Sequence, residues 1–300
     1  MRLANVASRA VLITSIGEPL TGVDVASASA GRFGPDLMGI YENWTGFRAW
    51  VDSVPSGVSS RVDRSDLGCP SPSPRQVVAI GLNYGEHARE SGFATPDSLP
   101  PTFTKFVTSL AGPDVTVTLP PGGHTDWEVE LVVVIGRTAR AVAESAAWDH
   151  VAGLAVGQDL SERIAQLRGP APQFSLGKSF ANFAPVGPWL TTPEEVRDRN
   201  DLVLGCSIDG ETVQNGRTVD LLFPVESLVS RLSHTISLLP GDLIFTGTPA
   251  GVGQGRDPQR FLQPGERLDS WIEGIGELHQ TFVASPTARS VGTSHPRQES

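Results

Sequence analysis

The chain has 300 residues, of which 39% are hydrophobic and 19% charged, so it can bury one large core or a large core with a small companion. Its formal net charge of -10 argues against nucleic acid or an anionic membrane as a partner, because both are bound by clustered lysine and arginine. The two cysteines form no CxxC motif, no signal-peptide core is present and no run of about 18 apolar residues occurs. We therefore expect a soluble, cytoplasmic protein.

The first 72 residues are predicted to form a small N-terminal domain with its linker. Alternating and β-branched residues predict strands at 10–14 and 21–25, and a helix is expected over 41–51. A segment rich in Ser, Pro and Gly over 55–74 then interrupts regular structure. The domain boundary is placed within it, near residue 72.

Residues 73–284 are predicted to form the main domain, which is rich in strand. Short β-branched runs between Gly and Pro turns predict its strands, at 77–80, 115–119 and 202–204. Two helices are expected, at 144–150 and 225–233. Residues 285–300 lack periodicity and are predicted to be a disordered tail. The fold class is α+β.

Residues 126–135, with the sequence DWEVELVVVI, place two carboxylates on a strand that is otherwise built to be buried. Because strand side chains alternate between faces, Glu128 and Glu130 point the same way, and Val132 and Val134 continue that face into the core. Two like charges held so close at a pocket wall need a cation. For these two residues alone, an exposed acidic strand end is the alternative.

Four further polar residues, in three separate stretches, are able to do chemistry. If a helix begins after Gly85, His87 and Glu90 share one face, and the carboxylate fixes the tautomer of the imidazole, as a general base for water needs. Asp159 follows a short apolar strand, and Lys178 lies in an aromatic, Pro-rich segment. Taken singly, each of these side chains is more typical of a turn or a surface.

Taken together, these stretches resemble the fumarylacetoacetate hydrolase family from about Val77 to Phe282. The motifs that carry the resemblance are, in chain order, GLNYGEHARE, PPTFTKF, DWEVELVVVIG, VAGLAVGQDLSER, GKSFANFAPVGPWL and PGDLIFTGTPAGVG. The last of them is rich in Gly and could hold an anion on backbone N–H groups, although it lacks the GK[ST] of a phosphate loop. The resemblance implies a mixed β-sandwich roll with a small N-terminal domain, and a homodimer.

The resemblance also implies roles for the residues that match the family's motifs. Glu128, Glu130 and Asp159 would be the metal ligands. His87 and Glu90 would form a dyad that activates water, on a segment at 82–98 that closes over the substrate as a lid. Lys178 would contact the substrate and stabilise its oxyanion, and the substrate pocket would be lined by Lys105, Gly247 and Thr248.

The chain departs from the family's pattern around the third ligand. Where the family commonly reads NDxSARD, this chain has Gln158 in place of the Asn and Ile164 in place of the second Asp. The ligand Asp159 is kept, so metal binding should be kept too. The loss of an acid next to the ligands should change how Arg163 is held, which bears on the substrate more than on the metal.

Three carboxylates make an all-oxygen site, which suits Mg²⁺, with Mn²⁺ or Ca²⁺ as alternatives, and does not suit Zn²⁺. The open positions could take the carboxylate and keto oxygens of a 2-oxo acid. We predict a hydrolase that cleaves a C–C bond of an acylpyruvate-type 2,4-diketo acid through a pyruvate enolate. A decarboxylase or a tautomerase or isomerase would use the same metal-enolate chemistry, and a non-catalytic binding protein is a further alternative. The dyad favours hydrolysis, because only hydrolysis strictly needs activated water.

Overall fold

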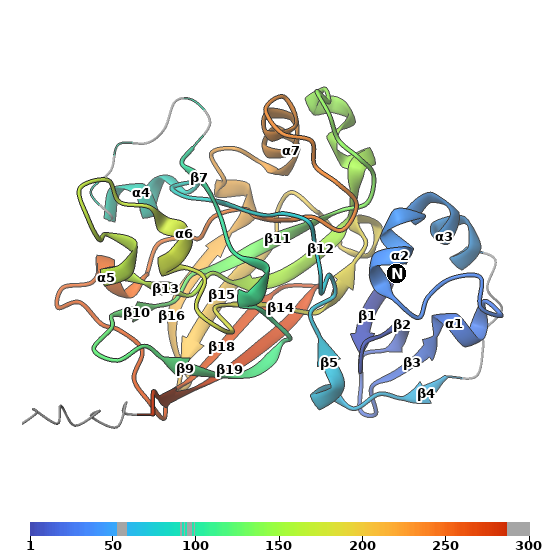
Figure 1. The fold of residues 1–300 in the computed structure, drawn as a ribbon, viewed down its shortest axis with the longest axis horizontal. Coiled ribbons are helices and arrows are strands. Elements are labelled where there is room, and N and C mark those ends of the chain that lie inside the picture. The colour runs from blue at the N-terminus through green and yellow to red at the C-terminus, as the bar shows by residue number, and fades with distance from the viewer. Residues whose placement is uncertain (53–58, 91, 93, 95–97, 99, 287–300) are drawn as a thin grey trace, which may run out of the picture.

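The computed structural model describes residues 1–52, 59–90, 92, 94, 98 and 100–286. Within these residues the chain is rich in strand, and two twisted sheets pack face to face (Figure 1). Apart from residues 285 and 286, the predicted disordered tail lies outside the described residues. Among those described, no helix is long and apolar enough to cross a membrane.

Twelve strands of the described chain form one mixed sheet. In spatial order its main path is β4 (Ser60–Arg61), β3 (Thr21–Asp24), β2 (Arg9–Ser15), β1 (Arg2–Val6), β14 (Ala184–Thr191), β12 (Val151–Gln158), β11 (Val129–Ile135), β17 (Leu243–Phe245), β6 (Val77–Ile80) and β7 (Thr102–Thr104). The short strands β5 (Leu67–Gly68) and β8 (Leu110–Ala111) pair with β1 and β14. Most pairs are antiparallel, whereas β17 pairs with β6 and β14 with β8 in parallel.

The second sheet covers one face of the first. Its order is β16 (Glu211–Arg217), β15 (Val203–Ile208), β18 (Arg267–Ile272), β19 (Gly276–Ala284) and β9 (Asp114–Leu119). Strands β11, β12 and β14 pack against β15, β18 and β19. A two-stranded ribbon joins β10 (Thr125–Asp126) to β13 (Ser161–Glu162) just outside this sandwich.

Strand β11 is buried on both of its faces. Leu131 and Val133 belong to the hydrophobic cluster between the two sheets, whereas Val132 and Val134 belong to a second cluster on the other face. The alternation expected from the sequence is therefore confirmed in the structure, and the face that carries the two glutamates continues into an apolar core. The second cluster also contains side chains of the N-terminal residues, such as Leu3.

The N-terminal residues extend the main sheet. β1 pairs with β14 in the register Arg2 with Thr191 and Leu3 with Leu190. The helices α1 (Val25–Ala28), α2 (Leu37–Glu42) and α3 (Trp44–Val51) lie beside this part of the sheet, at the opposite end of the molecule from α4 (Gly85–Glu90), α5 (Arg163–Gln166) and α6 (Phe174–Gly177) (Figure 1). The division into domains at residue 72 stays a prediction, because one sheet runs across it.

Three predicted elements differ in detail from those observed. The helix expected over 41–51 is two helices, because Asn43 leaves helical geometry with φ -120° and ψ 41°. The strand expected at 21–25 ends at Asp24, whose carboxylate caps α1 by accepting from the Ser27 N–H at 2.8 Å. The helix expected at 144–150 is a 3-10 helix, whereas α7 (Val225–Ser233) forms as predicted.

Gly157 on β12 allows the strands behind the two glutamates to approach closely. It pairs with Glu130, and a Cβ atom there would collide with the Val132 side chain and lie 2.8 Å from the Phe245 ring. We expect Gly157→Ala to lower the free energy of unfolding by about 1–3 kcal/mol, the usual cost of overpacking a core. Urea denaturation followed by tryptophan fluorescence would measure the change.

The matched control is Gly17→Ala, because Gly17 is exposed and the nearest atom to an added Cβ would be 3.7 Å away. That variant should change the free energy of unfolding by less than about 0.5 kcal/mol. Equal stability of the two variants would show that the space around Gly157 relaxes without cost.

Candidate metal and active site

Three buried carboxylates meet at the ends of β11 and β12. Glu128 precedes β11, Glu130 lies within it and Asp159 follows β12. The antiparallel register pairs Val129 with Gln158, which brings the ends of the two strands together. One carboxylate oxygen from each acid lies within 4.8 Å of the others, and the three residues are 5%, 1% and 0% exposed. Among the described residues, the sequence-predicted ligands thus form one cluster.

The pKa values of Glu128 and Glu130 are shifted in opposite directions. Burial acts to raise the pKa of Glu128, but the positive charges of Lys178 and Arg163 prevail and lower it to about 2. Burial, together with the negative charges of Asp159 and Glu128, holds the pKa of Glu130 well above its usual range. Without a cation, the Glu130 carboxyl therefore keeps its proton to higher pH than an exposed glutamate, and a cation bound beside it would favour its charged form.

Two buried lysines partly neutralise this cluster. The Nζ of Lys178 donates to Oε2 of Glu128 at 2.6 Å and to Oδ2 of Asp159 at 2.7 Å. The Nζ of Lys105 donates to Oδ1 of Asp159 at 2.5 Å and to the backbone carbonyl of Lys178. Burial lowers the pKa of Lys105. This lysine contacts a predicted ligand and is not part of the cavity wall.

The TGTP turn, residues 246–249, forms hydrogen bonds to strand β11. Gly247 has φ +101°, a conformation that favours glycine, and its N–H donates to Oε2 of Glu130 at 2.7 Å. The hydroxyl of Thr248 donates to the carbonyl of Val129 at 2.8 Å. Thr248 also lines the cavity next to the acids, whereas Gly247 contacts the predicted ligand instead.

The imidazole and carboxylate of the predicted dyad are in contact. His87 and Glu90 both lie on α4, with 2.8 Å between Nδ1 and Oε1. The Glu90 carboxylate also accepts from the Gly251 N–H, at 3.0 and 3.2 Å, which fixes the dyad to the turn after β17. His87 is only 7% exposed and lines the same cavity as Glu128. Of the predicted lid at 82–98, residues 91, 93 and 95–97 lie outside the described residues.

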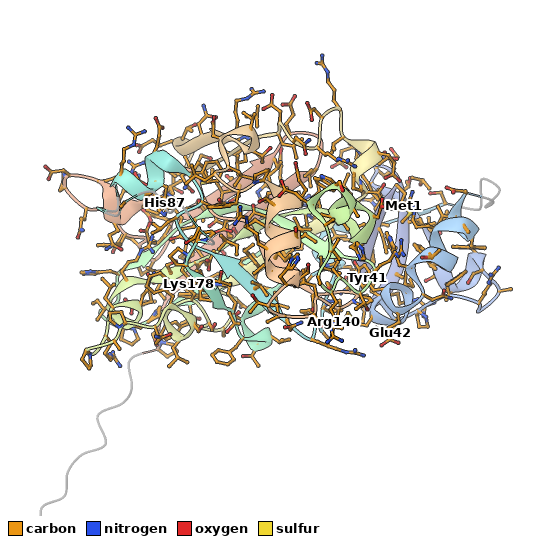
Figure 2. All side chains as sticks on the ribbon, turned by 90° about the horizontal axis from the view of Figure 1, so that it is seen from above. Met1, Tyr41, Glu42, His87, Arg140 and Lys178 are labelled. Carbon is orange, nitrogen blue, oxygen red and sulfur yellow. The ribbon has the colours of Figure 1, made fainter. Side chains whose placement is uncertain are left out.

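The cavity between the dyad and the acids has a volume of about 160 Å³. Its polar side is formed by His87, Glu128, Glu130, Lys178 and Thr248. Figure 2 shows His87 and Lys178 in the part of the molecule that lies away from Met1 and the N-terminal strands. The arrangement can bind a divalent ion on carboxylate oxygens and present an oriented imidazole to a molecule beside it.

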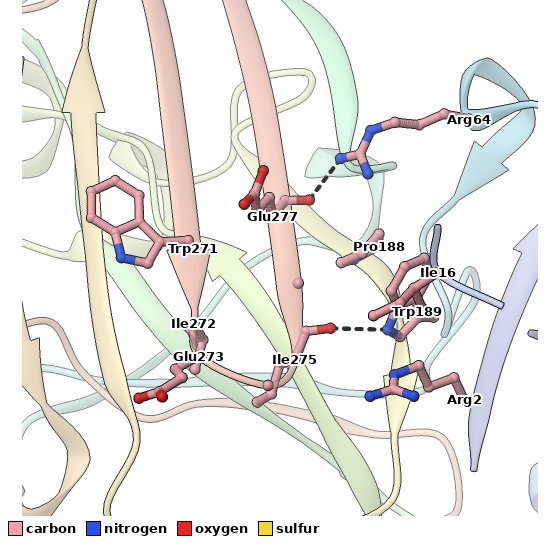
Figure 3. Close-up of a pocket in the computed structure, with 12 residues that line it drawn as sticks. Arg2, Ile16, Arg64, Pro188, Trp189, Trp271, Ile272, Glu273, Ile275 and Glu277 are labelled. Carbon is pink, nitrogen blue, oxygen red and sulfur yellow. Dashed lines mark hydrogen bonds between the residues drawn. The ribbon is translucent and has the colours of Figure 1, made fainter. Parts of the chain in front are cut away.

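Volume alone does not identify this site. A larger cleft, of about 430 Å³, lies between the N-terminal strands and the β18–β19 hairpin (Figure 3). Both of its arginines already form ion pairs, Arg64 with Asp114 at 2.7 Å and Arg2 with Glu195 at 3.5 Å. None of the sequence-predicted site residues lines it.

Asp126, which forms a buried pair with Arg163 next to the predicted ligands, was not predicted from the sequence as a part of the site. Asp126 accepts from Nε and Nη2 of Arg163 at 2.9 and 2.7 Å, and from the N–H groups of Gly253 and Gln254 at 2.6 and 2.9 Å. The Nη2 of Arg163 also lies 2.8 Å from Oε1 of Glu128. Asp126 could have been found from its spacing, because it precedes Glu128 by two residues and continues the same alternation.

Known proteins resemble this chain over most of its length. A family model described as fumarylacetoacetate (FAA) hydrolase C-terminal matches residues 76–283. The 2,4-didehydro-3-deoxy-L-rhamnonate hydrolase of Sphingomonas sp. (strain SKA58) is 45% identical over 215 residues, which is 71% of this chain and 75% of that protein. The mitochondrial oxaloacetate tautomerase FAHD2A of Homo sapiens is 41% identical over 215 residues, covering 71% of this chain and 68% of that protein.

Solved structures extend the similarity to the N-terminal residues. A protein from Mycobacterium smegmatis superposes with a TM-score of 0.90 at 54% identity, covering 95% of this chain and 100% of that one. The maleylpyruvate hydrolase of Sphingobium sp. SYK-6, in complex with manganese (II) ion and pyruvate, gives a TM-score of 0.77 at 28% identity with the same coverage. These matches confirm the expected fold. The chain belongs to the fumarylacetoacetate hydrolase family.

Proposed function

We propose that this protein is a divalent-metal-dependent hydrolase that cleaves a C–C bond of an acylpyruvate-type 2,4-diketo acid. The observation that carries the proposal is that His87, which contacts Glu90, lines the same cavity as Glu128 and Glu130. A base for water and a cluster of acids for a cation are the two requirements of this hydrolysis. Two relatives are named as hydrolases, of a didehydro-deoxy sugar acid and of maleylpyruvate.

The residues present fit a hard divalent cation. All ligand atoms offered by Glu128, Glu130 and Asp159 are carboxylate oxygens, and burial together with the negative charges of Asp159 and Glu128 raises the pKa of Glu130. When bound there, Mg²⁺ or Mn²⁺ would polarise the carboxylate and keto oxygens of a 2-oxo acid. We propose Mg²⁺ as the resident ion and, from family resemblance, a homodimer as the assembly.

The chain's own side chains supply the remaining chemistry. Because Nδ1 of His87 is engaged by Glu90, Nε2 is the atom that takes a proton from water. The resulting hydroxide attacks the distal carbonyl, and the C–C bond breaks to release a carboxylic acid and pyruvate enolate, which is protonated to pyruvate. Lys178, already among the acids, supplies positive charge beside the oxyanion, a kind of contact commonly worth about 3 kcal/mol or more.

Tautomerisation of a 2-oxo diacid is the second candidate function. The human relative is named as an oxaloacetate tautomerase, and enolisation needs a base beside a polarised keto group but no activated water. Release of pyruvate from an acylpyruvate, abolished by EDTA, would favour hydrolysis. Exchange of the C3 protons of oxaloacetate without carbon–carbon cleavage would favour tautomerisation.

Replacing Glu130 tests the metal site with two effects of opposite sign. In the wild type, Mg²⁺ at 100 times its dissociation constant should stabilise the fold by about 2.7 kcal/mol. Glu130→Gln should lose this response, because one of three ligand charges is gone. The metal-free variant should melt at a higher temperature than the metal-free wild type, because a buried acid that repels its neighbours has been neutralised.

Differential scanning fluorimetry with and without Mg²⁺ measures both effects. Glu86→Gln on α4 is the control, because that side chain is 81% exposed and does not line the cavity. A full Mg²⁺ response in Glu130→Gln would contradict the assignment of this ligand.

Replacing His87 separates the base from the metal site. His87→Ala should lower kcat for acylpyruvate cleavage by about 10²–10⁴-fold, the usual contribution of a general base. Oxalate, which mimics the enolate of pyruvate and needs no proton transfer, should bind the Mg²⁺-loaded variant with nearly wild-type affinity. Isothermal titration calorimetry gives the affinity. Parallel loss of oxalate binding and turnover would mean that His87 builds the pocket and does not act as the base.

A further inference from the structure

We infer that the acyl group of the substrate is uncharged, so that the 2-oxo acid carboxylate is the only negative charge the substrate carries. This inference rests on the proposed function and concerns the part of the cavity away from the three acids. An uncharged acyl group would distinguish the substrate of this protein from acylpyruvates that end in a second carboxylate.

Much of the cavity lining is apolar, and this part is called the apolar wall. It is formed by Leu82, Pro101, Phe103, Leu167 and Phe174, and the lining also includes the uncharged amides of Gln166 and Gln254 and the guanidinium of Arg163. The rings of Phe103 and Phe174 meet edge to face, with centroids 5.6 Å apart. The Nζ of Lys178 lies 5.0 Å from the Phe103 ring centroid, so this wall begins directly beside the charged side of the cavity.

Each cationic side chain at the cavity is already engaged by a carboxylate. Lys178 contacts Glu128 and Asp159, Arg163 contacts Asp126 and Glu128, and the imidazole of His87 contacts Glu90. Lys105, behind the wall, contacts Asp159. Of the residues outside the described part of the chain, 53–58, 91, 93, 95–97 and 99 include no Lys, Arg or His in sequence, whereas 287–300 include Arg289, His295 and Arg297. Every basic side chain among the described cavity residues therefore already contacts a carboxylate of the protein, and a second substrate carboxylate would have to compete for it.

The charge balance of the site leads to the same conclusion. Counted as fully ionised, the five carboxylates of Asp126, Glu128, Glu130, Asp159 and Glu90 and the three basic side chains of Lys105, Lys178 and Arg163 give a net charge of -2. One divalent ion would cancel this charge, and the carboxylate of a 2-oxo acid would then add one negative charge beside the ion. A second carboxylate against the apolar wall would be desolvated without a partner, which is strongly unfavourable.

Binding of two stable 2-oxo acids tests the inference without any catalytic step. 2-Oxohexanoate and 2-oxoadipate have the same number of carbons and chelate through the same end, but the first ends in a methyl group and the second in a carboxylate. With Mg²⁺ present, calorimetry should give a dissociation constant for 2-oxoadipate at least about 30-fold higher than that for 2-oxohexanoate. Equal or tighter binding of 2-oxoadipate would overturn the inference.

A positive charge placed on the wall should weaken this preference. Leu167 is 49% exposed, so Leu167→Arg should fold, which its melting temperature verifies, and Leu167→Gln is the matched uncharged control. Only the arginine variant should lower the ratio of the two dissociation constants, 2-oxoadipate over 2-oxohexanoate, by about 10-fold or more, as a new ion pair beside an apolar wall can. An identical ratio in both variants would show that the distal group does not lie against this wall, and the inference would fall.

Turnover separates this inference from the proposed function. Cleavage of 2,4-dioxoheptanoate should exceed that of 2,4-dioxoheptanedioate by a similar factor in kcat/KM. If neither is cleaved while 2-oxohexanoate still binds far more tightly than 2-oxoadipate, hydrolysis is wrong and the uncharged distal group stands. If the diacid is cleaved faster, hydrolysis stands and the inference is wrong. If neither 2-oxo acid binds in the presence of Mg²⁺, both are wrong.

Discussion

The burial of three like-charged carboxylates within 4.8 Å of one another is the constraint on which the rest of the site depends. Such a cluster repels itself and has lost most of its hydration, so it persists only where the surrounding fold supplies opposite charge and hydrogen-bond donors. Here Lys178 bridges Glu128 and Asp159, while the N–H of Gly247 donates to Glu130. The fold can thus hold the acids together before any ion binds. Lys178 donates to Glu128 and Asp159 but not to Glu130, so the negative charge is only partly neutralised and a cation could bind there.

The geometry of the cluster depends on backbone positions as much as on the acids. Residue 157 has to be glycine for β11 and β17 to pack closely on β12, and the left-handed residue at 247 turns an N–H toward Glu130. Both positions act on the ligand strand from outside the cavity. Their role is to keep three side chains from two strands at separations that a single ion can span.

Arg163 forms ion pairs with Asp126 and with Glu128, one of the proposed metal ligands, and so links that ligand to the proposed substrate wall. Arg163 also donates to Gln166, which lines the cavity, so the same guanidinium orients a ligand and a wall residue. The loss of an acid at position 164 does not leave Arg163 without a partner, because Asp126 holds it on the other side. Because Arg163 contacts both Glu128 and Gln166, a change at this guanidinium would affect a proposed metal ligand and a cavity residue together.

The parts of the site that the sequence could predict are those governed by local periodicity. Strand alternation places Glu128 and Glu130 together, and a spacing of three on a helix places His87 against Glu90, so both pairs follow from their neighbours alone. The contact of Asp126 with Arg163 joins residues 37 positions apart and arises from the pairing of β10 with β13, which no local pattern encodes. The same holds for β1, which pairs with β14 across most of the chain. Long-range strand pairing therefore determines which polar residues meet, and the local pattern determines only which of them can point the same way.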